Sequence, residues 1–278
     1  MERDKSVAKQ KTQIGILGLG KMGEAWVCGL RESGAAVEFR ASTRSEGSAK
    51  DAASRLKISV VTQNGAVVKG AEVVLLSVKP HQAEKVLREV RAELSRKKPL
   101  VISICAGVTT AQLAEWAGPK VPIVRAMPNT PALIRQGMTV LCAGPSATQA
   151  HLDLADRLFA AVGRTAQVEE SLMDGVTGLS GCGPAYVYLM IEALSEAGVK
   201  VGLPRETATL LAAQTLSGAS QMVLARGEHP AALKDEVTTP AGCTIDGLMA
   251  LEEGRLRMTL IKAVLAATER SQGLRSGK

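Results

Sequence analysis

The stretch of sequence that decides the fold is Gln13-Ile14-Gly15-Ile16-Leu17-Gly18-Leu19-Gly20-Lys21-Met22-Gly23. Residues 13–17 form an apolar run that predicts a β-strand, and residues 18–23 match the pattern G-x-G-x-x-G. A helix is expected over residues 22–33 and a second strand over residues 37–41. Strand, glycine-rich turn, helix and strand within about 30 residues are what a Rossmann dinucleotide-binding unit requires.

Each glycine of this turn has a physical role. Gly18 permits the tight turn, Gly20 lets a pyrophosphate approach the backbone, and Gly23 allows close packing of the helix on the strand. The helix start offers free N–H groups to the phosphates. We therefore expect the loop Gly18, Leu19, Gly20, Lys21, Met22 and Gly23 to bind the coenzyme.

The end of the second strand discriminates between the two nicotinamide coenzymes. An NAD enzyme usually places Asp or Glu there to hold the ribose hydroxyls. Here the chain has Ala41-Ser42-Thr43-Arg44-Ser45, whose hydroxyls and guanidinium suit a 2′-phosphate. We expect NADPH at Ser42, Thr43 and Arg44, with NADH as a possible substitute. The alternative is that Arg44 is simply a solvated loop residue.

Apolar runs continue the strand pattern at residues 59–61, 73–77, 100–104 and 121–126, with helices expected over residues 82–94 and 109–116. This alternation predicts a mainly parallel, doubly wound sheet covered by helices on both faces. Ligands bind beyond the carboxyl ends of such strands. Those ends carry Asn64, the segments 77–80 and 105–107, and the segment 127–131.

The second half of the chain differs in character. After a strand over residues 139–143, a helix over 146–161 and a strand over 164–168, nearly everything from Leu172 onward predicts helix, with long helices over 184–197, 204–226 and 255–270. We expect a disordered tail at 1–12, a dinucleotide-binding domain at 13–168, and an all-α substrate and dimerisation domain at 169–278. Apolar residues on more than one face of these helices indicate an intertwined homodimer.

Two segments stand out within the helical half. Residues 177–185 place three glycines ahead of a helix, and residues 238–244 lead into a helix expected over 245–252. The second segment combines a helix start with the hydroxyls of Thr238, Thr239 and Thr244, which suits a carboxylate. Simple capping, with Thr244 as the N-cap, explains the same residues.

Composition excludes several other classes of protein. The net charge is +7, but no basic stripe follows from the sequence and aromatic residues make up 2%, so nucleic-acid binding is not expected. Cys28, Cys105, Cys142, Cys182 and Cys243 are scattered, which predicts neither a metal site nor a disulfide framework. No signal peptide or membrane span is indicated, and we expect a cytoplasmic protein.

The chain resembles the pyrroline-5-carboxylate reductase family over nearly its whole length. The motifs that carry the resemblance are residues 18–23, 78–80, 127–131, 179–185, 202–206 and 239–244. The resemblance implies reduction of 1-pyrroline-5-carboxylate to L-proline, the last step of proline biosynthesis, by hydride transfer from NADPH or NADH. It also implies an interwoven homodimer, with rings of dimers in some members.

The resemblance further assigns residues to the site. Ser42, Arg44 and Asn64 would approach the adenosine ribose or its phosphate. The nicotinamide side would be lined by Val78, Lys79, Pro80, Cys105 and Ala106. The substrate would lie between Asn129, Glu170 and the Thr239 and Gly242-Cys243-Thr244 turn, with the turn contributed by the partner subunit. We expect Thr244 to hydrogen-bond the imine nitrogen, while N–H groups of residues 242–244 hold the carboxylate.

The chain departs from the family pattern at three positions. The family commonly has Ser at Cys182, Gly at Ala241 and Asn at Glu236.

Three other functions are alternatives to this expectation. Another cyclic-imine reductase stays open as an alternative. A β-hydroxyacid dehydrogenase would need a lysine on the central helix, and residues 184–197 contain none. A non-catalytic nucleotide sensor would be expected to break the glycine loop or the substrate turn, and both are intact.

Overall fold

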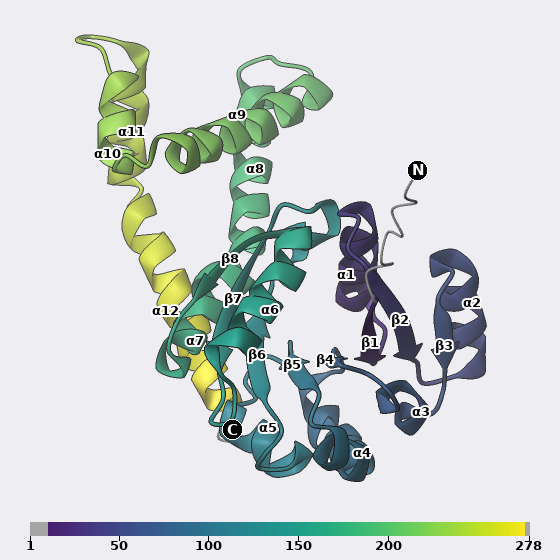
Figure 1. Cartoon of the computed structure of the whole chain (residues 1–278). Coiled ribbons are helices and arrows are strands. Elements are labelled where there is room, and N and C mark those ends of the chain that lie inside the picture. Colours follow the sequence, from purple (N-terminus) through teal and green to yellow (C-terminus); the bar gives the residue numbers. More distant parts are fainter. Residues whose placement is uncertain (1–10, 276–278) are drawn as a thin grey trace, which may run out of the picture. The chain divides into compact units, whose positions relative to one another are not determined.

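The computed structural model describes residues 11–275, which form two compact units. Residues 11–181 together with 267–275 are the nucleotide unit, and residues 182–266 are the helical unit (Figure 1). The expected disordered tail lies outside the described residues except for its last two positions, of which Thr12 begins the first strand. The domain boundary expected between residues 168 and 169 stays a prediction.

The nucleotide unit is built on one eight-stranded sheet with the order β3-β2-β1-β4-β5-β6-β7-β8. Its strands are β1 (Thr12–Leu17), β2 (Val37–Ser42), β3 (Ser59–Val61), β4 (Val73–Leu76), β5 (Leu100–Ser103), β6 (Ile123–Met127), β7 (Gly137–Ala143) and β8 (Gly163–Gln167). All neighbouring pairs are parallel except β6 and β7. The prediction of a mainly parallel, doubly wound sheet is confirmed.

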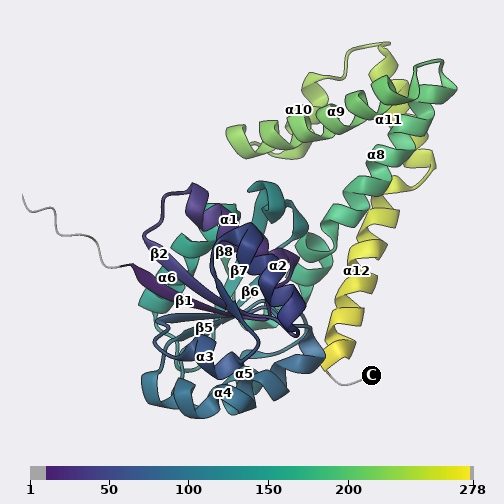
Figure 2. The ribbon, with the colours of Figure 1, turned by 90° about the vertical axis from the view of Figure 1, so that its right-hand side faces the viewer.

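Helices cover both faces of this sheet (Figure 2). They are α1 (Lys21–Glu32), α2 (Glu46–Leu56), α3 (Asn64–Val68), α4 (Ala83–Lys97), α5 (Thr110–Ala117) and α6 (Gln149–Phe159). One buried cluster joins α1 and α6 to the sheet, and a second joins α3, α4 and α5 to its other face. In the first cluster, Trp26 packs on Phe159 with ring centroids 5.3 Å apart and donates a hydrogen bond to the Leu158 carbonyl.

Short helical segments connect or follow these elements. They are η1 (Pro80–Gln82), η2 (Thr130–Ile134), η3 (Ala160–Val162), η4 (Glu170–Leu172), α7 (Met173–Val176) and the π-helical turn η5 (Thr177–Gly181). The connection between β6 and β7 contains only η2, which is too short for a parallel crossover, so these two strands pair antiparallel.

The strand order creates a binding position at one edge of the sheet. The chain leaves β1 toward β2 on one side, whereas β4 lies on the other side of β1. At such a switch point the loops after the two central strands diverge and leave a crevice beyond their carboxyl ends. The loops concerned here are residues 18–20 after β1 and residues 77–79 after β4.

The helical unit contains α8 (Gly183–Lys200), α9 (Arg205–Arg226), α10 (Pro230–Glu236), α11 (Cys243–Glu253) and most of α12 (Leu256–Arg275). Within its described residues, only Ser195, Ala208 and Ala212 are buried. Large apolar side chains are exposed instead along α8, α9, α11 and α12. These helices therefore have little interior of their own.

Candidate active site

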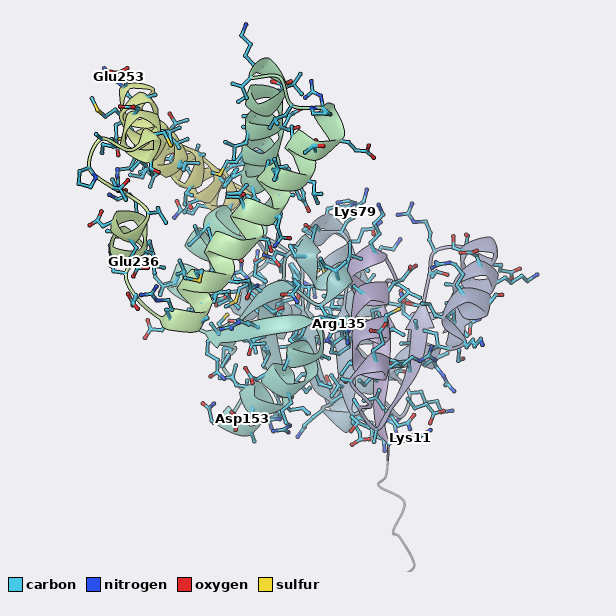
Figure 3. All side chains as sticks on the ribbon, turned by 90° about the horizontal axis from the view of Figure 1, so that it is seen from above. Lys11, Lys79, Arg135, Asp153, Glu236 and Glu253 are labelled. Atoms are coloured by element: carbon cyan, nitrogen blue, oxygen red, sulfur yellow. The ribbon has the colours of Figure 1, made fainter. Side chains whose placement is uncertain are left out.

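A groove of about 990 Å³ opens at the switch point of the sheet. Its walls come from the loop after β1, the end of β2, the start of α3, the loop after β4 and one face of α4. The predicted coenzyme residues that line it are Gly18, Leu19, Gly20, Ser42, Thr43, Arg44, Asn64, Val78 and Lys79. Lys79 is also marked in Figure 3, at the exposed end of its loop.

Two glycines shape this groove in different ways. Gly18 has φ +83°, and a Cβ there would collide with the Val78 side chain. At Gly20 a Cβ would meet no atom within 4 Å, and the residue lines the groove. A side chain at Gly20 would therefore project into space that a pyrophosphate needs, whereas one at Gly18 would break the turn itself. The groove thus fits a dinucleotide.

The end of β2 is joined to the glycine loop by hydrogen bonds. The buried hydroxyl Oγ of Ser42 accepts from the Gly18 N–H at 3.3 Å and donates to Asn64 Oδ1 at 2.7 Å. Asn64 Nδ2 in turn donates to Glu89 Oε2 on α4 at 2.9 Å. In this structure Ser42 therefore connects the glycine loop to Asn64 within the groove wall.

The groove carries cations on its open side. The side chains of Arg44, Lys79 and Lys85 line it and form no hydrogen bond or ion pair with other residues of the described chain. Ser45 caps α2 through the Ser48 N–H at 3.3 Å, so the start of that helix lies beside Arg44. A helix start and a free guanidinium together favour an anion such as a 2′-phosphate.

Six residues predicted to contact the coenzyme do not line this groove: Lys21, Met22, Gly23, Pro80, Cys105 and Ala106. Gly23 is buried in α1 against Leu19, Ile16 and Ser77, which fits the role of close helix packing. Cys105 is also buried, and its Sγ lies 3.3 Å from the Val78 carbonyl oxygen. Burial raises the pKa of the Cys105 thiol to about 11, so it stays protonated and supports the loop after β4 from beneath.

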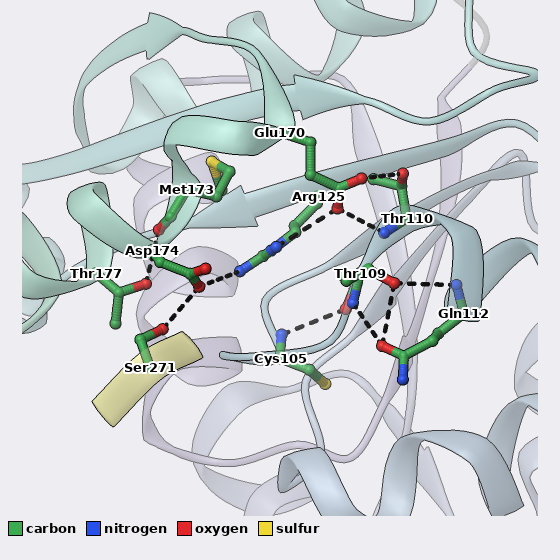
Figure 4. A network of polar contacts seen from close by, with 11 residues as sticks. Cys105, Thr109, Thr110, Gln112, Arg125, Glu170, Met173, Asp174, Thr177 and Ser271 are labelled. Atoms are coloured by element: carbon green, nitrogen blue, oxygen red, sulfur yellow. Dashed lines mark hydrogen bonds and ion pairs between the residues drawn. The ribbon is translucent and has the colours of Figure 1, made fainter. Parts of the chain in front are cut away.

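The side chains of two residues that were predicted to bind the substrate form hydrogen bonds within the protein. Asn129 follows β6; its Nδ2 donates to the Ser180 carbonyl at 3.2 Å and its Oδ1 accepts from the Met138 N–H at 2.8 Å. Glu170 accepts from both the N–H and the hydroxyl of Thr110 at the start of α5, each at 2.6 Å (Figure 4). In this structure both side chains hold neighbouring segments of the nucleotide unit together.

Glu170 also belongs to a buried charged cluster that the sequence did not reveal (Figure 4). Arg125 of β6 is 1% exposed, and its Nη1 donates to Glu170 Oε1 at 3.4 Å. Its Nη2 lies 4.0 Å from Asp174 Oδ1 and has no hydrogen-bond partner among the described atoms. The Ser271 hydroxyl of α12 donates to the same Asp174 oxygen at 2.9 Å. The cluster thereby ties the end of α12 to the sheet.

The turn before α11 contains the remaining predicted substrate residues. The Gly242 N–H donates to the Thr239 carbonyl at 3.0 Å across Pro240 and Ala241. Gly242 is the N-cap, and Cys243 begins the helix. Thr244 therefore lies inside the first turn, and its interpretation as the N-cap was wrong. The Thr244 hydroxyl forms no hydrogen bond within the described chain, so it is available to a ligand.

Two of the three sequence departures have a local structural consequence. Ala241 has φ +55°, a left-handed conformation that favours the glycine common in the family. Glu236, at the end of α10 (Figure 3), accepts two hydrogen bonds from Arg226, at 2.7 and 2.6 Å. These bonds hold the pKa of Glu236 below its usual value. Its charge is thus compensated by Arg226.

The groove also contains residues that were not predicted, among them Gln82, the N-cap of α4, and Lys85, Val86 and Glu89 on α4 itself. Lys85, Val86 and Glu89 lie three, four and seven residues after Gln82, so the four residues share one face of the helix, beside its buried face. The helix predicted over residues 82–94 places these four residues on one face, but helical periodicity does not show that this face meets the groove. Within the described residues, no cluster of His, Cys, Asp or Glu suited to a metal is present. None of the described helices combines the length and apolar character that crossing a bilayer requires.

The central helix is longer than predicted. It extends from Gly183 to Lys200 and so contains one lysine in its last turn, whereas the predicted helix ended before it. Lys200 is about 25 Å along the axis from the helix start, at 1.5 Å per residue. The absence of lysine, which argues against a β-hydroxyacid dehydrogenase, therefore holds for residues 184–197 of α8 but not for its last turn.

Comparison with known proteins identifies the family. A family model described as pyrroline-5-carboxylate reductase dimerisation matches residues 170–274, and one described as NADP oxidoreductase coenzyme F420-dependent matches residues 13–107. Pyrroline-5-carboxylate reductase from Arabidopsis thaliana is 41% identical over 270 residues, covering 96% of this chain and 97% of the relative. The chain belongs to the pyrroline-5-carboxylate reductase family.

Solved structures of the family agree with this assignment. The reductase from Coxiella burnetii superposes with a TM-score of 0.89 at 37% identity, covering 96% of this chain and 99% of that one. The reductase from Plasmodium falciparum, solved with NADP bound, gives a TM-score of 0.85 at 32% identity and the same coverage of both chains. As a member of this family, the chain is an NADP-dependent oxidoreductase, and its dimerisation region indicates self-association.

Proposed function

We propose that this chain reduces 1-pyrroline-5-carboxylate to L-proline with NADPH, the last step of proline biosynthesis. The observation that carries the proposal is the groove at the switch point, with its glycine turn, free cations and no acid at the end of β2, in a member of this family. The bound coenzyme supplies a hydride to the imine carbon, the C=N bond becomes a single bond, and the ring nitrogen ends protonated.

The nucleotide unit binds the coenzyme in this proposal. Gly20 leaves space for the pyrophosphate, and Arg44 with the start of α2 receives the 2′-phosphate. Ser42 and Asn64 form the wall beside the adenosine ribose, and Val78 and Lys79 lie toward the nicotinamide. Pro80, Cys105 and Ala106 act from outside the groove, as supports for the loop after β4.

The turn before α11 binds the substrate in this proposal. Its N–H groups at residues 242–244 hold the carboxylate, since a helix start favours an anion. The free Thr244 hydroxyl hydrogen-bonds the ring nitrogen, and Thr239 and Cys243 flank it. A pyrroline nitrogen can already be protonated near neutral pH, so orientation of the imine, rather than proton donation, is the role of Thr244. Asn129 and Glu170 contribute by holding the segments around the end of β6.

We also propose an interwoven homodimer formed through the helical unit, in which the partner subunit contributes the substrate turn. The exposed apolar side chains of α8, α9, α11 and α12 support this proposal, and a ring of dimers is the larger assembly that a mass measurement would reveal. No disulfide bond joins cysteines within the described residues, which supports action in the reducing cytoplasm.

The proposal is tested by following absorbance of the reduced nicotinamide with purified protein and pyrroline-5-carboxylate, with NADPH and NADH in parallel. The six-membered cyclic imino acid serves as the competing substrate. Faster oxidation with the five-membered imine and with NADPH is expected. A higher kcat/KM for the six-membered imino acid would show that this compound, and not pyrroline-5-carboxylate, is the preferred substrate. A preference for NADH would overturn the role of Arg44. No oxidation with either imine would reject the activity.

A further inference from the structure

The carboxylate of Glu89 lies in the groove that is proposed to bind an anionic coenzyme. Glu89 lies on α4 and lines the groove, where it is the only acidic residue among the groove's described lining. A negative charge in this groove repels the phosphates of a dinucleotide. The hydrogen bond that Glu89 accepts from Asn64 points to a role other than direct attraction of the coenzyme.

Glu89 is the last acceptor in a continuous series of hydrogen bonds. The Gly18 N–H donates to Ser42 Oγ, the Ser42 hydroxyl donates to Asn64 Oδ1, and Asn64 Nδ2 donates to Glu89 Oε2, at 3.3, 2.7 and 2.9 Å. Every bond points in the same direction, from the glycine turn to α4. Bonds in such a series polarise and strengthen one another.

The series depends on the orientation of one amide. The Asn64 side chain could rotate by 180° and exchange its oxygen and nitrogen, which would leave the Ser42 hydroxyl opposite a donor. An ionised carboxylate accepts but cannot donate, so Glu89 selects the orientation with Nδ2 toward α4. The oxygen then faces Ser42, and the hydroxyl of Ser42 keeps its lone pair directed at the Gly18 N–H.

We propose that Glu89 is a positioning residue for coenzyme binding. It fixes the amide of Asn64, and through Asn64 it fixes the Ser42 hydroxyl and the first peptide of the glycine turn. This inference rests on the proposed coenzyme groove. Because the glycine turn serves the pyrophosphate common to both coenzymes, Glu89 supports NADPH and NADH alike.

Two substitutions separate the hydrogen bond of Glu89 from its charge. Glu89→Gln retains an oxygen that can accept from Asn64 Nδ2 but removes the charge, whereas Glu89→Ala removes both. Glu93→Ala is the matched control, because Glu93 is one turn further along α4, forms no hydrogen bond or ion pair within the described chain and lies outside the groove. Each variant is titrated with NADPH and with NADH by calorimetry, and kcat is measured at saturating coenzyme.

We expect Glu89→Ala to raise both dissociation constants by about 3- to 10-fold, the loss that follows from one hydrogen bond. Glu89→Gln and Glu93→Ala should stay within about twofold of the parent protein for NADH, with Glu89→Gln equal or tighter for NADPH. The kcat at saturating coenzyme should be unchanged in all three. The rescue by Gln separates positioning from an effect of charge.

Unchanged affinities in Glu89→Ala would overturn the inference, as would a Glu89→Gln variant that binds as weakly as Glu89→Ala. Arg44→Ala, titrated alongside, separates this inference from the proposed function. If the parent protein binds neither coenzyme, or Arg44→Ala binds NADPH as the parent does, the proposed groove fails. If Arg44→Ala loses NADPH affinity and Glu89→Ala does not, only the role of Glu89 fails.

Discussion

The nucleotide unit and the helical unit differ in how many of their apolar side chains they bury. The first encloses two apolar clusters on the two faces of its sheet, with Trp26 and Phe159 in one and Leu87 and Leu94 in the other. The second buries only Ser195, Ala208 and Ala212 within its described residues, while Leu210 is 68% exposed. The first unit has its own core, whereas the second needs another surface to complete one.

This difference fits the proposal that the nucleotide unit binds the coenzyme and the helical unit binds the substrate. A rigid, self-sufficient sheet holds loops in fixed positions, which suits a coenzyme whose many atoms must be aligned. In the proposed dimer, the helices of the second unit complete their core by association, and the proposed substrate turn before α11 then depends on the partner. Changes in the two units should therefore have different consequences.

The largest expected effect follows from charging the exposed apolar face of α9. Leu210→Glu combined with Leu224→Glu places two carboxylates on one face of α9, away from Ala208 and Ala212. We expect loss of the dimer and of nearly all imine reduction, because a buried unpaired charge costs several kcal/mol at an interface. Sedimentation velocity measures the mass, and coenzyme titration should show retained binding.

The control for this variant is Arg91→Glu combined with Lys97→Glu, at exposed positions of α4. It should keep the mass and activity of the parent protein. If the α9 variant keeps the parent mass at micromolar concentration, the helical unit is complete without a partner and the comparison fails.

How far the sequence predicts this molecule depends on whether a feature is local. The glycine turn, the strands and the long helices follow from apolar periodicity and turn residues, and all were predicted to within a few residues. Arg125 escaped notice because it lies inside an apolar strand, and its partners Glu170 and Asp174 are distant in sequence. Glu170 was assigned to the substrate, yet its carboxylate binds Thr110, which no local pattern reveals.

The α4 wall illustrates the same limit. Its helix was predicted, but which face meets the groove depends on the strand order, and a repeat of apolar residues does not encode that order. The short helices α2, α3 and α10 were not predicted either. Their sequences are polar or brief, and contacts with neighbouring elements stabilise them more than their own periodicity does.

The second prediction concerns the core of the nucleotide unit. Arg125→Met should destabilise the protein by about 3–5 kcal/mol, because it removes the buried cation beside the carboxylates of Asp174 and Glu170. Denaturant unfolding measures the change. Arg88→Met is the control, since its pairs with Glu84 and Glu115 are exposed and should contribute below about 1 kcal/mol. Equal effects of the two substitutions would contradict the role of the buried cluster.

The third prediction uses the cysteines to compare the units. The raised pKa of Cys105, about 11, results from burial, so the thiolate is scarce at pH 8. Iodoacetamide should label the exposed Cys243 of the helical unit at least tenfold faster than Cys105, as measured by peptide mass spectrometry. The stability that protonated Cys105 contributes is complete below the ordinary thiol pKa of 9.0 and is lost as the pH rises toward about 11. Equal labelling at pH 8 would show that the sheet opens readily.

The smallest expected effect lies in the substrate turn. Ala241→Gly should relieve the left-handed strain at φ +55°, and the flexibility of glycine in the unfolded chain offsets part of the gain. The net result is stabilisation by up to about 1 kcal/mol, measured by thermal unfolding. Ala250→Gly, inside α11, is the control and should destabilise by about 0.5–1 kcal/mol. A destabilising Ala241→Gly would show that the turn is not strained.

The most direct test of the division between coenzyme and substrate binding compares Gly20→Val with Thr244→Ala. For each variant, the NADPH dissociation constant and kcat/KM for pyrroline-5-carboxylate are measured on the same preparation. Gly20→Val should weaken NADPH binding by about 100-fold, because its side chain enters the groove, whereas Thr244→Ala should keep the NADPH dissociation constant and lower kcat/KM about 10-fold or more. An unaltered kcat/KM in Thr244→Ala, or unaltered NADPH binding in Gly20→Val, would contradict the account.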